Sequence, residues 1–193
     1  MAYSALLDAN VLHPINLCDL LLRFAERGFY RPLWSRDILN ETTQSVARQH
    51  PGVSPESLER RVRFMEDAFP DAMVSGYEGL TPGLTVFGTD SHVVAAAIVG
   101  HADVVVTQNV RDFPAEALAA YRLLAQTPDD FLIHQWWLDP GSAAQVLIGQ
   151  SAATRRPHRS PEEILDHLGK SVPAFAAIVR SSNEFARLLG DGW

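Results

Sequence analysis

The sequence is poor in cysteine and in long apolar runs. Cys18 is the only cysteine among 193 residues, so an intramolecular disulfide and a cysteine-rich zinc site are excluded. It stands in an apolar stretch, which predicts a buried side chain. No run approaches the ~20 apolar residues of a membrane helix, and no basic, apolar leader precedes Tyr3. We therefore expect a soluble, cytoplasmic protein with no membrane partner.

Positive charge is also scarce. The formal net charge is −7 at pH 7, and Lys170 is the only lysine. Surfaces that bind nucleic acid are usually basic, so this balance argues against such a function. Arginine supplies nearly all of the positive charge, however, and its planar guanidinium suits phosphate. A carboxylate cluster holding cations would account for part of the negative excess, so the composition leaves a nuclease open.

The apolar pattern predicts an α/β fold. Hydrophobic residues make up 47% of the chain, enough for a real core. Strands are expected over residues 2–7, 29–34, 72–75, 103–107 and 121–126, and helices over 15–27, 35–48, 54–69, 90–101, 115–119 and 129–138. This alternation is typical of a parallel sheet flanked by helices. The three consecutive valines at 104–106 indicate a strand buried on both faces.

The pattern changes near Pro140, after which only helices are expected. We predict two parts, an α/β domain over 1–139 and a helical C-terminal extension over 140–193. A polar stretch over 154–160 interrupts the helices. Ser160 and Glu163 match a capping box, which predicts a new helix start.

Four acids stand where such a fold could bring them together. Asp8 directly follows the first strand, and Asp112 comes five residues after Thr107, where the strand over 103–107 ends. Asp90 begins the helix that leads into that strand, and Glu41 lies about two turns into its own helix. Open parallel sheets place their sites at the carboxyl ends of the strands. We therefore expect the four carboxylates to converge at one edge of the sheet.

Clustered carboxylates repel one another unless a counter-charge is present. A divalent cation would remove the conflict, and oxygen ligands without thiolates favour Mg²⁺ or Mn²⁺. Such a metal lowers the pKa of a bound water and offsets charge on a phosphate. The acids therefore point to metal-assisted chemistry on a phosphate.

Four segments resemble the PIN-domain family. They are LLDANVL at 6–12, WSRDILNE at 34–41, TDSHVVAAA at 89–97 and TQNVRDFP at 107–114. Each segment alone is weakly specific, but together they occur in the family's order, and the last is the most specific. The resemblance covers about residues 2–138.

The resemblance implies a PIN-like three-layer α/β/α sandwich with a central, mostly parallel sheet. It implies a Mg²⁺- or Mn²⁺-dependent endoribonuclease that hydrolyses RNA phosphodiester bonds. Bacterial members are mostly VapC-type toxins of type II toxin–antitoxin pairs, so the expected partners are RNA, a cognate antitoxin and a second copy of the chain. By position, the catalytic and metal-binding residues would be Asp8, Glu41, Asp90 and Asp112, with Asn10, Thr107 and Asn109 in support.

Other interpretations stay open. The helical tail is longer than in minimal toxins, which leaves an RNA-processing nuclease as an alternative, and a non-catalytic RNA- or protein-binding module is a third. A haloacid-type phosphatase is set aside because it needs a second aspartate where this chain has Asn10. Structurally, Asp8 could be a turn residue, Glu41 a solvated helix residue and Asp90 a helix cap. Asp112 could be a loop acid paired with Arg111.

Three further features are less decisive. His92 is expected to be an ordinary histidine on a helix surface. The pair Trp136-Trp137 could stack on RNA bases, but we expect it to pack its helix against the sheet. Arg155, Arg156 and Arg159 form a dense basic cluster of the sequence. We expect them to contact RNA phosphate or an antitoxin, with a solvated loop as the alternative.

Overall fold

A computed structural model of the chain describes residues 3–155 and 157–190. It divides into two compact units, one of residues 1–13 and 30–126, the other of 14–29 and 127–193. The prediction put the division at 139/140. The boundary between the two compact units lies after Gln126, and the second unit also takes residues 14–29, while the predicted domain boundary stays a prediction. The helix over 128–138 joins this unit because its apolar side chains pack on helices from later in the chain.

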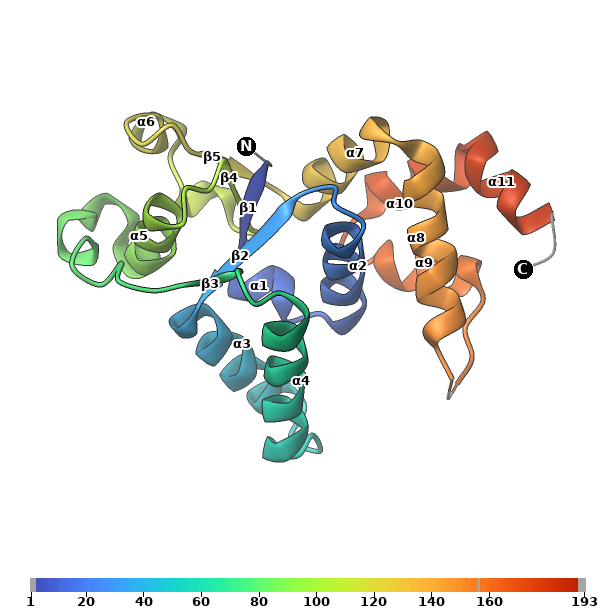
Figure 1. Cartoon of the computed structure of the whole chain (residues 1–193), viewed down its shortest axis with the longest axis horizontal. Helices are drawn as coiled ribbons and strands as arrows, with labels where there is room; N and C mark the ends of the chain where they lie inside the picture. The colour runs from blue at the N-terminus through green and yellow to red at the C-terminus, as the bar shows by residue number, and fades with distance from the viewer. Residues whose placement is uncertain (1–2, 156, 191–193) are drawn as a thin grey trace. The chain divides into compact units, whose positions relative to one another are not determined.

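The first unit is built on a five-stranded parallel sheet in the order β3-β2-β1-β4-β5 (Figure 1). Its strands are β1 (Ser4–Leu7), β2 (Arg31–Ser35), β3 (Met73–Val74), β4 (Val104–Val106) and β5 (Leu124–Gln126). Its helices are α1 (Ala9–Leu12), α3 (Arg36–Gln49), α4 (Pro55–Ala68), α5 (Ser91–Val99) and α6 (Ala115–Ala119), with short 3-10 turns η1 (Thr81–Gly83), η2 (Thr85–Asp90) and η3 (Val110–Asp112). The predicted α/β fold with a parallel sheet is confirmed.

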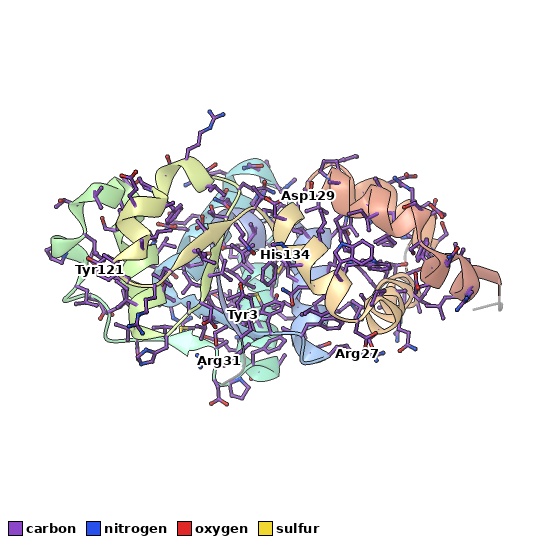
Figure 2. The ribbon with its side chains drawn as sticks, turned by 90° about the horizontal axis from the view of Figure 1, so that it is seen from above. Tyr3, Arg27, Arg31, Tyr121, Asp129 and His134 are labelled. Carbon is purple, nitrogen blue, oxygen red and sulfur yellow. The ribbon has the colours of Figure 1, made fainter. Side chains whose placement is uncertain are left out.

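The centre of the sheet follows the apolar sequence pattern. Every residue of β1 and β4 is buried, as the valine run predicted. Helix α5 packs against β1, β2 and β4 with its alanine- and valine-rich surface. Arg31, labelled in Figure 2, donates to the Gly100 carbonyl at 2.8 Å and so ties β2 to the end of α5. The rigid centre holds the carboxyl ends of β1 and β4 side by side.

The described elements of the second unit are all helices, namely α2 (Ile15–Glu26), α7 (Pro128–Leu138), α8 (Pro140–Ala153), α9 (Pro161–Leu168), α10 (Pro173–Ser181) and α11 (Asn183–Gly190). Helix α2 packs on α8 and α9, and α7 packs on α10 (Figure 1). Asp129, labelled in Figure 2, accepts from the backbone N–H groups of Ala174 at 3.0 Å and Phe175 at 2.7 Å. This carboxylate therefore caps the start of α10 from a helix 45 residues earlier.

The two tryptophans of α7 behave differently from each other. Trp136 is fully buried, with its ring centroid 6.2 Å from that of Phe175 in α10, whereas Trp137 is 64% exposed. Trp136 therefore belongs to the core of the helical unit, and the packing of this pair against the sheet stays a prediction. Cys18 is buried as predicted. Across the described part of the chain, no helix has the length and apolarity to cross a membrane.

Candidate active site

Asp8 stands at the carboxyl end of β1, where the strand turns into α1. Its backbone N–H still bonds to the Val106 carbonyl of β4 at 3.1 Å. Its side chain caps α1 by accepting from the Ala9 N–H at 2.6 Å. The residue is only 7% exposed. Burial and this capping bond hold the Asp8 carboxylate in one orientation. The sequence had not predicted a helix at this position.

Asn10 and Thr107 hold the second oxygen of this carboxylate. The Thr107 hydroxyl donates to Asp8 Oδ2 at 2.7 Å, and the Asn10 amide donates to the same oxygen at 2.7 Å. Asn10 also donates to Thr107 Oγ1 at 2.9 Å and accepts from the Gln108 N–H at 2.9 Å. Asn109 joins this network through its backbone N–H, which donates to Thr107 Oγ1 at 3.1 Å. The structure thus places two of the three supporting residues against Asp8 by their side chains.

Glu41 reaches this region from α3. Ser35 caps that helix, as predicted, by accepting from the Ile38 N–H at 3.2 Å. The Glu41 carboxylate lies 3.3 Å from Nε2 of His92 in the first turn of α5. Its side chain is 49% exposed, so it borders solvent while the Asp8 carboxylate is enclosed.

Asp90 and Asp112 complete the predicted set. Asp90 stands at the N-cap of α5, but its side chain makes no capping hydrogen bond, so a cap role does not account for it. The chain turns into this position at Gly88, whose φ of +54° is rarely adopted by other residues. Asp112 ends the exposed turn η3. Within the described residues, no ion pair joins Asp112 to Arg111. The alternative that Asp112 is a loop acid paired with Arg111 therefore has no support.

The pKa values show that these acids share one electrostatic environment. Burial raises the pKa of Asp8, and this effect is the largest. The hydrogen bonds from Thr107, Ala9 and Asn10 and the charge of His92 lower the pKa by less. Burial also raises the pKa of Glu41, and the charges of Asp8 and Asp90 raise it further.

Asp90 completes this electrostatic coupling. Burial raises its pKa, followed by the charges of Asp8 and Asp112. Each pair that interacts in this way must lie close enough for its charges to be felt. The charges of Asp8 and Asp112 thus influence Asp90, while the convergence of the four acids into one site stays a prediction.

His92 is a site residue that sequence reasoning missed. Its side chain is 14% exposed, and its Nδ1 lies 3.0 Å from the Thr89 carbonyl oxygen. Its charge lowers the pKa of Asp8, Glu41 and Asp90. The expectation of an ordinary surface histidine is wrong, because the first turn of α5 points it into the acid cluster. Its position two residues after Asp90, in the same helical turn, was the available signal.

The donor chemistry of the cluster suits a divalent cation. Its carboxylates raise one another's pKa, which is the repulsion that such a cation relieves. Oxygen donors of this kind are the preferred ligands of Mg²⁺ and Mn²⁺. Over residues 3–155 and 157–190, no group of three or more histidine, cysteine or acidic side chains is arranged to hold a metal ion. The metal and its ligands stay predictions.

The basic cluster lies in the second unit, between α8 and α9. Arg155 is exposed. Arg159 is held in the loop by two hydrogen bonds. Its backbone N–H donates to Thr154 Oγ1 at 2.8 Å, and its guanidinium donates to Asn16 Oδ1 at 3.4 Å. Arg156 falls outside the described residues. The RNA or antitoxin contact of this cluster stays a prediction.

Comparison with known proteins agrees with the resemblance seen in the sequence. A family profile described as the VapC50 C-terminal domain matches residues 128–181, most of the helical unit. A protein of Mycobacterium tuberculosis named "Putative ribonuclease VapC50" is 39% identical over 109 residues. That match covers 56% of this chain and 64% of the relative, so the chain spans less than two thirds of the relative's length. No solved structure matches. The two matches support the resemblance to VapC-type proteins of the PIN-domain family.

Proposed function

Starting from this resemblance to VapC-type proteins, we propose that the chain is a Mg²⁺- or Mn²⁺-dependent endoribonuclease, the toxin of a type II toxin–antitoxin pair. The observation that carries the proposal is the acid cluster at the carboxyl end of β1, where Asp8, Glu41 and Asp90 carry raised pKa values in one environment. Its partners would be RNA, a cognate antitoxin and a second copy of the chain, and its location the cytoplasm.

Each residue of the cluster has a role that follows from its surroundings. Asp8, Glu41, Asp90 and Asp112 would hold the metal, which when bound would activate water and offset charge on the phosphate. Thr107 and Asn10 fix Asp8 through the bonds described above, so its carboxylate need not reorganise during the reaction. His92 lies between Glu41 and the Thr89 carbonyl oxygen, where a protonated ring would pair with the Glu41 carboxylate.

The proposal is tested by cleavage of a permissive single-stranded RNA by the purified chain. We expect fragments with defined ends, loss of cleavage on adding EDTA, and recovery on adding excess Mn²⁺. The variant Asp71→Asn, which changes an exposed acid away from the cluster, should cleave like wild type. Cleavage that survives thorough chelation would contradict the metal, and failure to cleave any RNA with Mn²⁺ present would contradict the function.

A further inference from the structure

A pocket of about 440 Å³ opens directly beside the acid cluster. It lies within the first unit, between α1 and α3. Glu41, Ser45 and Arg48 line it from α3, and Asn10 and His13 line it from the α1 side. The three α3 residues recur at helical spacing and so share one face. The volume is within the usual range of small-molecule sites, about 300–1,000 Å³.

Arg48 supplies an uncommitted positive charge to this pocket. It is exposed in the last turn of α3, two turns from Glu41. In the part of the chain that the structure describes, no hydrogen bond or ion pair engages its guanidinium. Two other arginines of this unit are engaged, since Arg36 pairs with Glu66 at 2.5 Å and Arg61 donates to the Leu12 carbonyl. A free guanidinium beside an acid cluster is suited to a phosphate of the same ligand.

His13 brings an unsatisfied polar atom to the opposite wall. Its Nε2 is buried without a hydrogen-bond partner among the described residues, and its ring stacks on His50 at a centroid distance of 6.0 Å. Burial, followed by the charges of His50 and Arg61, lowers its pKa. A neutral imidazole can both donate and accept, which suits a ribose hydroxyl or a base edge rather than a phosphate.

We propose that this pocket binds a nucleotide of single-stranded RNA next to the cleaved phosphodiester, with Arg48 on its phosphate and His13 on its ribose or base. The inference rests on the proposed function, since it assigns a place to the strand that the acid cluster cleaves. The wall shared with Glu41 and Asn10 makes the pocket continuous with the site around Asp8. An RNA strand bound in this pocket would run from Arg48 to the carboxylates of the acid cluster.

The binding test uses Asp8→Asn as background, so that the RNA stays intact, and a short fluorescent single-stranded RNA as the probe. Adding Arg48→Ala should weaken binding about tenfold or more, as expected for one lost charge-assisted contact. It should also reduce the slope of log K against log salt by roughly 0.7. Arg48→Lys should recover part of the affinity. The matched control is Arg63→Ala, an exposed arginine of α4 outside the pocket, which should bind like the background.

Kinetics separate this pocket from the proposed function itself. In the otherwise unchanged chain, Arg48→Ala and His13→Ala should raise KM several-fold and leave kcat near its original value, because the lost contacts are made to ground and transition state alike. If wild type cleaves RNA while both variants match it in KM and affinity, the pocket proposal is overturned and the function stands. The pocket proposal is also overturned if Arg48→Ala weakens only the binding of a protein partner. If wild type neither binds nor cleaves RNA, the function fails and the pocket proposal with it.

Discussion

Thr107 illustrates what a single side chain does in this site. It is fully buried, donates to Asp8, and accepts from Asn10 and from the Asn109 backbone. The sequence marked Thr107 only as the end of a valine-rich strand and as part of a resemblance. Its bonds to Asp8 and Asn10 join positions almost 100 residues apart, so no local pattern could reveal them.

Asp90 should cost stability at neutral pH. Burial, followed by the charges of Asp8 and Asp112, raises its pKa above the ordinary 3.8, so the folded chain binds this proton more tightly than the unfolded chain. The cost therefore grows as pH rises from 3.8 through the folded pKa, and it is absent below 3.8. The Asp90 side chain also makes no capping bond that a substitution would lose.

We therefore expect Asp90→Asn to raise the free energy of unfolding at pH 7 by about 0.5 kcal/mol, the size of interactions between partly exposed charges. The gain should shrink toward zero near pH 3.8. Urea unfolding of both proteins in metal-free buffer at the two pH values checks this. Equal stability at pH 7, or a gain that is largest in acid, would contradict the electrostatic account.

The contact between α5 and the sheet depends on one glycine. A Cβ added at Gly100 would lie 2.8 Å from Val74 Cγ2 and 3.1 Å from Leu33 Cδ1. These atoms belong to β3 and β2, so the end of α5 approaches two strands closely. The helix that carries Asp90 and His92 at its other end is positioned by this approach.

Gly100→Ala should lower the free energy of unfolding by about 1–3 kcal/mol, because an extra methyl group there overpacks the helix–sheet contact. Gly79→Ala is the matched control, since nothing lies within 4 Å of its added Cβ. Chemical denaturation of the two variants measures the difference. If Gly100→Ala proves as stable as Gly79→Ala, α5 does not pack on the strands as closely as described.

Most elements of the first unit could be predicted because each carries a local signal. Ser35 predicts the start of α3 because it is a good capping residue, and the three consecutive valines predict β4. Helix α1 gave no such signal, since it is only four residues long and its cap, Asp8, also suits a site residue. His92 was misjudged because its position beside Asp90 was a weak signal, and its contact with Glu41 of α3 depends on how two helices pack.

The division of the whole chain was harder to predict. Residues 14–29 read as an ordinary amphipathic helix between two strands, and that helix would equally suit the sheet. Its partner is instead the C-terminal set of helices, where Phe24 lies 6.3 Å from Phe175 by ring centroids. The periodicity of one helix shows that it has an apolar face. It does not show which other element that face packs against.

The central claim is that the acids gathered at the end of β1 are the active site of a ribonuclease. Its most direct test compares Asp8→Asn with wild type and with Asp71→Asn in cleavage of the same RNA with Mn²⁺, after circular dichroism has shown that all three are folded. We predict that Asp8→Asn lowers kcat on the order of 100-fold or more, as expected when a group that stabilises transition-state charge is removed, and that Asp71→Asn matches wild type. A folded Asp8→Asn protein that cleaves RNA as fast as wild type would contradict the account.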